Sequence, residues 1–217
     1  MAENLDIVVF GGSFDPPHAG HEQMARLALT RASRLIFMPA HRSPLKHAQP
    51  ARFEQRVRML EIVCARLAKN GLSVSVTDME GKRPPPSYTI ESLREIQSQN
   101  PSLRISLLVG SDSLADFASW KDPDAIAREF DLMVAYRITD KEAESSIRKV
   151  ESEFKARITA LPGEIPGCAS RDIRRWIRSE ASGLVKEGGE ESLLKDCMAR
   201  DVLDYIRAQG LYLNVSN

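Results

Sequence analysis

Long hydrophobic runs are missing from this chain of 217 residues. No apolar stretch approaches the roughly 20 residues that a membrane-spanning helix needs, so we expect no membrane partner. The chain begins with the acidic stretch 1–6, and the apolar run from Ile7 to Phe10 is too short for the core of a secretion signal. These absences predict a soluble, cytoplasmic protein.

An excess of charge of one sign is also missing, because 30 lysines and arginines balance 30 aspartates and glutamates. Proteins that bind nucleic acid through its phosphates usually carry a clear basic excess, so we expect no nucleic-acid partner. The basic residues are nevertheless unevenly placed. Residues 41–83 hold nine basic and four acidic residues, and residues 171–178 hold four arginines and one aspartate. This distribution predicts that positive charge is concentrated around one cleft.

Cysteine is scarce. The three cysteines, Cys64, Cys168 and Cys197, lie far apart in the sequence, form no CxxC pair and leave at least one thiol unpaired within the chain. This usage is typical of the reducing cytosol and gives no zinc ribbon. Cys64 occupies an apolar position of a predicted helix, so we expect it in the core.

What the sequence does contain is an alternation of short β-branched runs with longer amphipathic ones. Strands are predicted at residues 5–10, 34–38, 72–77, 103–109 and 132–136. Helices are predicted at residues 19–32, 51–69, 88–98, from about 113, and at 140–157, 170–180 and 190–208. Strands separated by helices predict an α/β fold with a doubly wound parallel sheet covered on both faces, in the order 3-2-1-4-5.

No internal repeat, low-complexity tract or linker divides the chain. We therefore expect a single domain over residues 1–217, which is an ordinary size for one large domain. Within it, the α/β core would extend to about residue 165. A small C-terminal helical part would occupy residues 166–217.

The segment from Gly11 to His21, GGSFDPPHAGH, follows the first predicted strand and opens the first predicted helix. In open α/β sheets, ligands bind at such positions. Glycines permit close backbone approach, and a helix N-terminus offers free N–H groups to an anion. His18 and His21 can direct both imidazoles at one ligand. Three interpretations remain open: a phosphate site, a metal pair with Asp15 as third ligand, or a proline turn with surface histidines. The lack of a distant Cys or His group disfavours the metal.

Five segments together resemble the HxGH nucleotidyltransferases, and specifically the bacterial nicotinate-nucleotide adenylyltransferases. The segment GGSFDPPHAGH resembles that family's GGTFDPxHxGH motif. Met38–Lys46 resembles the family's loop after the second strand, and Pro86–Thr89 resembles its PSYT segment. Gly110–Leu114 with Trp120 resembles its GxDSL…W stretch, and Tyr205–Tyr212 resembles its YI…GLY ending. The resemblance covers most of the chain in order and implies a Rossmann-like nucleotidyltransferase fold.

The resemblance also implies an activity: transfer of AMP from ATP to nicotinate mononucleotide, giving deamido-NAD and pyrophosphate, a step of NAD biosynthesis. The nucleophile is a phosphate oxygen that is already ionised at pH 7, so no general base is needed. The protein must hold two anions in line and offset the charge that develops on pyrophosphate. Mg²⁺ is expected as the cofactor, bound mainly through the ATP phosphates, and no metal-binding residue is predicted.

The site residues are implied position by position where this sequence matches the family's motifs. The catalytic residues would be His18, His21, Lys46 and Arg174. ATP would be bound by Gly11, Gly12, Ser13, Phe14, His18, Gly20, His21, Gly110, Asp112, Ser170 and Arg174. Nicotinate mononucleotide would be bound by Lys46, Ser87, Tyr88, Thr89 and Trp120.

Some of these residues have a specific expected role. Tyr88 and Trp120 would offer flat faces to the pyridine ring. Asp112 would accept a hydrogen bond from a ribose hydroxyl, unless it is only a helix cap. Arg174, on the first turn of a helix, would steady the β- and γ-phosphates and the leaving group.

One segment departs from the family pattern ISSTxIR. The aligned residues 168–174 keep Ser170 and Arg174, but Ala169 replaces the first serine and Arg171 replaces the threonine. Arg171 would either restore a charged donor or alter the contacts to the triphosphate. Two alternatives follow: a catalytically weakened nucleotide-binding protein of the same fold, or a sister adenylyltransferase with another acceptor such as phosphopantetheine. The PSYT and Trp120 segments disfavour the second.

Overall fold

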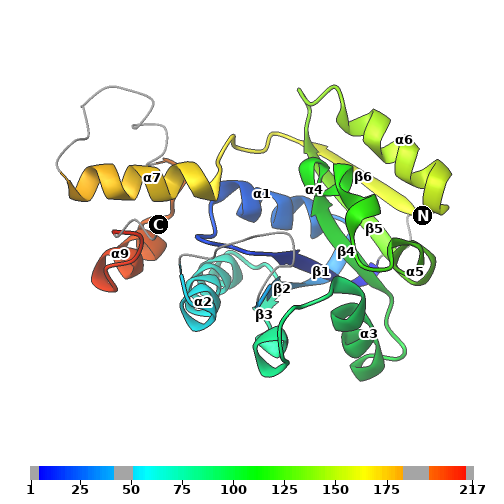
Figure 1. The fold of residues 1–217 in the computed structure, drawn as a ribbon, viewed down its shortest axis with the longest axis horizontal. Coiled ribbons are helices and arrows are strands. Elements are labelled where there is room, and N and C mark those ends of the chain that lie inside the picture. Colours follow the sequence, from blue (N-terminus) through cyan, green and yellow to red (C-terminus); the bar gives the residue numbers. More distant parts are fainter. Residues whose placement is uncertain (1–4, 42–50, 183–195, 214–217) are drawn as a thin grey trace.

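The computed structural model describes residues 5–41, 51–182 and 196–213. In this part of the chain, six parallel strands form one sheet in the order β3-β2-β1-β4-β5-β6 (Figure 1). The strands are β1 Leu5–Gly12, β2 Ala32–Pro39, β3 Val74–Val76, β4 Ile105–Gly110, β5 Asp131–Arg137 and β6 Ile158–Gly163. The predicted doubly wound parallel sheet is confirmed, and so is the order of its first five strands.

Helices connect the strands and cover the sheet on both sides (Figure 1). They are α1 Ala19–Ala28, α2 Phe53–Lys69, α3 Thr89–Gln99, α4 Ser111–Ala115, α5 Pro123–Glu129, α6 Ala143–Phe154, α7 Ser170–Ala181 and α9 Arg200–Ala208. Two 3₁₀ turns, η1 Met79–Lys82 and η2 Phe117–Ser119, complete the described elements. None of the described helices is long and apolar enough to cross a membrane.

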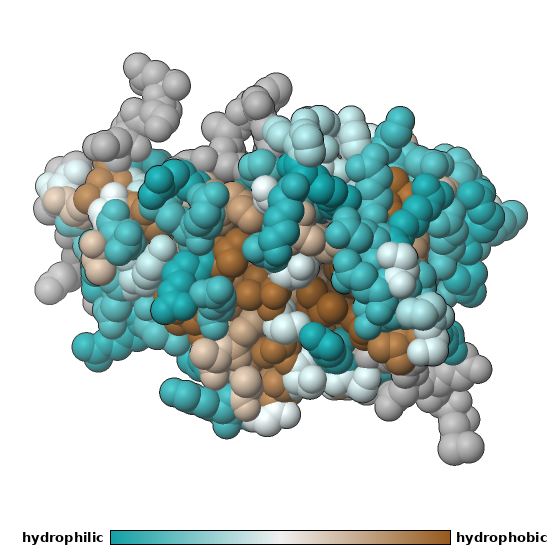
Figure 2. Space-filling view, turned by 90° about the horizontal axis from the view of Figure 1, so that it is seen from below, coloured by the Kyte–Doolittle hydropathy of each residue, from teal (hydrophilic) through white to brown (hydrophobic). Residues whose placement is uncertain are grey.

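Alternate side chains of each central strand enter two different cores, because successive residues of a strand point to opposite faces. In β1, Val8 and Phe10 join the core with α1, α2, α7 and α9. Ile7 and Val9 join the core with α3, α4, α5 and α6. Burial on both faces explains why these strands are continuous apolar runs. Seen from the side of α2 and α3, polar side chains form much of the surface, and apolar ones gather near its middle (Figure 2).

Three predictions about local structure were wrong. The edge strand β6 was not predicted, and its half-exposed residues and Pro162 explain the weak signal. The helix predicted over residues 190–208 is broken, because residues 197–199 are not helical and α9 begins at Arg200; residues 190–195 lie outside the described part. The cysteine usage was interpreted as typical of the reducing cytosol, but Cys168 and Cys197 form a disulfide across 29 residues. Cys64 is free and buried, as predicted.

The C-terminal segments lie against the helices that follow β1 and β2. Figure 1 shows α7 and α9 together at one end of the molecule. The backbone N–H of Ala19, at the start of α1, donates to the carbonyl of Cys197 at 2.9 Å. Arg66 of α2 pairs with Glu22 of α1 at 2.5 Å and with Asp201 of α9 at 3.0 Å. The end of the described chain therefore contacts the element that carries the two histidines.

Candidate active site

The glycine-rich segment begins at the carboxyl end of β1, between the two neighbours of that strand in the sheet. The chain runs from β1 to β2 on one side, whereas β4 lies on the other side. This reversal of strand order is the place where open α/β sheets bind their ligands. Gly110, which ends β4, lies at the same edge, and a Cβ built on it would lie 3.5 Å from Met24 of α1. Gly11, Gly12 and Gly110 therefore lie together at the carboxyl edge of the sheet.

The loop between β1 and α1 is held by an aromatic side chain that folds back into the protein. Phe14 adopts a left-handed backbone conformation, with φ at 49°, and is 1% exposed. Its ring centroid lies 5.2 Å from that of Phe10 and 4.9 Å from that of His21. A Cβ on Gly12 would lie 2.9 Å from the Phe14 ring, which is too close for any side chain. Gly12 is therefore required for the packing of Phe14, in addition to any contact with a ligand.

The two histidines face each other at the first turn of α1. Their ring centroids are 3.7 Å apart in a stacked arrangement, and the backbone N–H of His18 donates to Nδ1 of His21 at 3.2 Å. His18 is 8% exposed, and burial lowers its pKa to about 4, so it is neutral at pH 7. Among the described residues, its buried Nδ1 has no hydrogen-bond partner. A buried polar atom without a hydrogen-bond partner is unfavourable unless a ligand or a water molecule supplies the missing bond.

Helix α7 contributes Ser170 and Arg174, two polar residues that match the ISSTxIR pattern. Ser170 Oγ donates to the carbonyl of Pro16 at 2.9 Å, and Arg174 Nη1 donates to the carbonyl of Asp15 at 2.5 Å. Both side chains therefore contact the glycine-rich loop, as a shared site requires. Because α7 begins at Ser170, Arg174 opens its second turn, not its first. The Arg171 side chain is 78% exposed and lies 3.7 Å from Asp172, so it extends along the helix surface.

The segments expected to bind the acceptor also come together, although they are far apart in the sequence. Tyr88 precedes the first residue of α3, and the Nζ atom of Lys121 lies 5.9 Å from the centre of its ring. Trp120, next to Lys121, packs its ring 5.6 Å from that of Phe117. Ser87, Tyr88, Thr89 and Trp120 are all partly buried. Lys46 lies outside the described residues.

Asp112 lies in the first turn of α4, just after β4, but does not cap the helix. Gly110 is the N-cap of α4, and Asp112 Oδ1 accepts a hydrogen bond from the N–H of Ser113 at 2.8 Å. A Cβ on Gly110 would lie 2.6 Å from that oxygen. The glycine therefore leaves room for the carboxylate, which remains exposed to solvent.

Sequence reasoning missed two buried carboxylate contacts. Asp15, considered as a metal ligand, is 3% exposed and accepts a hydrogen bond from Tyr212 Oη at 2.6 Å. Burial raises the pKa of Asp15, whereas Tyr212 and two nearby arginines lower it. Glu80 is also 3% exposed and accepts hydrogen bonds from Ser92 Oγ at 2.7 Å and from the N–H of His41 at 3.2 Å. The motifs that contain Asp15 and Tyr212 do not reveal that the two residues pair, and no motif marks Glu80; each contact joins distant segments.

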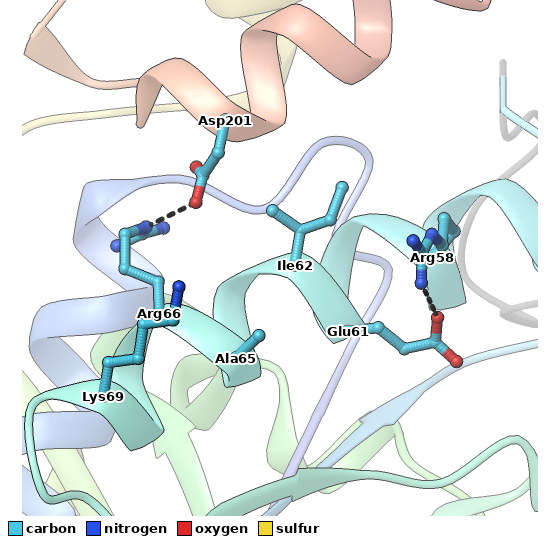
Figure 3. A pocket seen from close by; sticks show the side chains of 7 residues that line it. All are labelled: Arg58, Glu61, Ile62, Ala65, Arg66, Lys69 and Asp201. Carbon is cyan, nitrogen blue, oxygen red and sulfur yellow. Dashed lines mark hydrogen bonds and ion pairs between the residues drawn. The ribbon is translucent and has the colours of Figure 1, made fainter.

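A hollow of about 300 Å³ lies elsewhere, between α2 and α9 (Figure 3). Its lining residues are Arg58, Glu61, Ile62, Ala65, Arg66, Lys69 and Asp201. Arg66, the central cation, is already paired with Glu22 and Asp201. The hollow contains no residue of the glycine-rich loop, so it is not the candidate active site.

Comparison with known proteins places this geometry in a family. The cytidylyltransferase-like family matches residues 9–175. A protein of Chlorobium luteolum described as a "probable nicotinate-nucleotide adenylyltransferase" is 32% identical over 96% of this chain and 98% of its own. A protein of Chlorobium phaeovibrioides with the same description is 37% identical over 81% of this chain and 97% of its own. The chain belongs to the cytidylyltransferase-like family, among its nicotinate-nucleotide adenylyltransferases.

Solved structures agree with the fold of this nicotinate-nucleotide adenylyltransferase. The nicotinic acid mononucleotide adenylyltransferase of Plasmodium falciparum, solved in complex with NaAD, superposes with a TM-score of 0.75. The alignment covers 98% of this chain and all of the other, at 20% sequence identity. At that identity the likeness establishes the fold, and the chemistry must be argued from the residues of this chain.

Proposed function

We propose that this nicotinate-nucleotide adenylyltransferase transfers AMP from ATP to nicotinate mononucleotide, releasing pyrophosphate and forming deamido-NAD. The observation that carries the proposal is the stacked pair of His18 and His21, which lies where the strand order reverses. A neutral imidazole with an unpartnered nitrogen at the end of a glycine-rich loop suits a hydrogen bond to a phosphate.

The proposed chemistry is a displacement at phosphorus. A phosphate oxygen of nicotinate mononucleotide forms a bond to the α-phosphorus of ATP, and the bond from that phosphorus to the bridging oxygen of pyrophosphate breaks. The attacking oxygen is already ionised at pH 7, so the protein contributes position and charge. His18 and His21 would hold the triphosphate. Arg174 donates one N–H to the backbone carbonyl of Asp15. Its remaining N–H donors would offset the charge on the leaving pyrophosphate.

We propose that the ATP substrate arrives as its magnesium complex. Among residues 5–41, 51–182 and 196–213, no three His, Cys, Asp or Glu side chains come together as a metal site. Asp15 is buried and bonded to Tyr212, so it is poorly placed as a ligand. Magnesium would therefore be held by phosphate oxygens and waters, which it accepts readily, and would reduce the charge of the triphosphate.

For the acceptor, we propose the crevice bordered by the PSYT and Trp120 segments. The partly exposed rings of Tyr88 and Trp120 would stack on the pyridine ring, with Ser87 and Thr89 beside it. Lys46 would reach a phosphate as a point charge. We further propose that residues 1–217 act as one nucleotidyltransferase domain, because segments on both sides of residue 165 contact the same loop. A cytoplasmic location is proposed on the sequence alone, and the Cys168–Cys197 disulfide is atypical of that compartment.

A pyrophosphate-release assay tests the proposal. Wild-type protein with MgATP should release pyrophosphate faster with nicotinate mononucleotide than with nicotinamide mononucleotide. Arg174→Ala should lower kcat by about 10²-fold, as expected for loss of one charged transition-state contact. The matched control is Arg175→Ala, the next residue of α7, whose side chain is 67% exposed; its kcat should match the wild type.

His21→Ala provides a second test on α1. Turnover should fall strongly while circular dichroism shows an intact fold. Full activity in this variant would refute the phosphate role of the histidine pair. Binding of ATP by the wild type without pyrophosphate release, with either mononucleotide, would instead favour a catalytically weakened nucleotide-binding protein.

A further inference from the structure

Arg56 is a charged residue in the core of the protein. It lies in the first turn of α2 and is 1% exposed, and it is the first among the largest fully buried side chains. Arginine is almost never buried to this degree without partners, because removing its charge from water is costly. The burial of Arg56 therefore requires a specific set of hydrogen-bond partners.

Three backbone carbonyls surround the Arg56 guanidinium, and each belongs to a different segment. Nη1 donates to Ser13 at 2.8 Å, Nη2 to His41 at 3.2 Å, and Nε to Ala51 at 3.3 Å. Ser13 lies in the glycine-rich loop between β1 and α1, and His41 follows β2. Because all three acceptors are main-chain atoms, Arg56 fixes the path of the backbone itself.

A buried carboxylate balances the charge of this arginine. Asp15, two residues after Ser13, is 3% exposed. Burial lowers the pKa of Arg56 while the Asp15 carboxylate raises it again, so the guanidinium stays charged. Tyr212 Oη donates to the same carboxylate at 2.6 Å. The loop is thus held at Ser13 by Arg56 of α2 and at Asp15 by Tyr212, which follows α9.

We propose that Arg56 is a positioning residue for adenylyl transfer. It holds the carbonyl of Ser13 against the backbones of His41 and Ala51, and thereby sets the loop that delivers His18 to the triphosphate. Arg56 itself touches no substrate. The proposal rests on the function proposed above and assigns the placement of the ATP-binding loop to a residue outside that loop.

A purely structural role predicts a different result from a positioning role. If Arg56 only stabilised the fold, molecules that remain folded would keep normal kinetics. If it positions the loop, folded molecules should still be impaired, and more toward ATP than toward the acceptor. Displacements of about 1 Å in a reacting complex can cost on the order of 100-fold in rate.

The test compares Arg56→Lys and Arg56→Met, assayed well below their melting temperatures. Lysine keeps the charge but cannot replace the planar guanidinium fork at three acceptors. We expect kcat to fall about 10- to 100-fold, and KM to rise more for ATP than for nicotinate mononucleotide. Arg56→Lys should retain more activity than Arg56→Met. The control is Leu67→Ala, a buried position in the last turn of the same helix, which should lower Tm without changing either KM.

Two further measurements keep the proposal falsifiable. ATP affinity by isothermal titration calorimetry should weaken in Arg56→Lys even if the wild type proves unable to use nicotinate mononucleotide, which separates this proposal from the proposed function. If both Arg56 variants fail to fold, Tyr212→Phe, which removes one hydroxyl at the other end of the loop, should raise KM for ATP selectively. Wild-type kcat and ATP affinity in folded Arg56→Lys, or equal effects on both substrates, would overturn the proposal.

Discussion

The buried imidazole of His18 makes the stability of the protein depend on pH in a predictable way. Burial lowers its pKa from 6.5 to about 4, with desolvation as the cause. In the unfolded chain the same side chain takes up a proton near pH 6.5. Below that pH the unfolded state therefore binds more protons than the folded state, and the stability present above pH 6.5 is lost as the pH falls toward 4.

The size of this effect follows from the difference between the two pKa values. From 6.5 to about 4, at about 1.4 kcal/mol for each pKa unit, the loss is roughly 3 kcal/mol of unfolding free energy. No discount for solvent screening is needed, because His18 is only 8% exposed. His18→Gln keeps a polar side chain but cannot titrate, so it should lack this loss.

Urea unfolding between about pH 7.5 and pH 4 measures the effect. The difference in unfolding free energy between wild type and His18→Gln should shift by roughly 3 kcal/mol in favour of the variant as the pH falls. Val8→Ala, which removes core methyl groups from β1 and keeps His18, should follow the wild type in parallel. Parallel curves for His18→Gln and wild type would refute the claim that the folded protein holds His18 neutral.

Three other substitutions test the contacts around the loop. Tyr212→Phe should cost about 1–3 kcal/mol in urea unfolding, since it removes a hydrogen bond from the buried Asp15 carboxylate; an unchanged midpoint would contradict that contact. Gly12→Ala should cost about 1–3 kcal/mol and weaken ATP binding, because its methyl group meets the Phe14 ring; calorimetry with ATP checks this. Cys197→Ser should lower unfolding free energy by about 3–4 kcal/mol relative to the oxidised wild type, and equal stabilities under non-reducing conditions would argue against the disulfide.

The sequence predicted the parts of this fold that depend on local patterns. Buried parallel strands such as β1 are apolar runs that stop at glycine, so their number and order could be inferred for five of the six. The strand β6 was not predicted because it lies at the edge of the sheet, where half of its residues need not be apolar. The disulfide was not predicted because a separation of 29 residues along the sequence does not determine the distance between two cysteines in space.

The candidate site was predicted where it coincides with motifs, and missed where it depends on the core. The loop and α7 contact each other as the shared motif implied. Arg56 was overlooked, although a signal existed: it lies three and four residues before Met59 and Leu60, on the buried stripe of α2. The apolar neighbour Val57, by contrast, is only partly buried. A charged residue on an apolar stripe indicates a buried polar contact.

The contacts between the two ends of the described chain have a consequence for the synthesis of this protein. Ala19 is bonded to Cys197, Arg66 to Asp201, and Asp15 to Tyr212. A ribosome delivers the second member of each pair last, after all six strands have been made. A growing chain can therefore assemble its sheet while the glycine-rich loop still lacks its contact with Tyr212. We expect nascent chains to become able to bind ATP tightly only when translation has passed Tyr212.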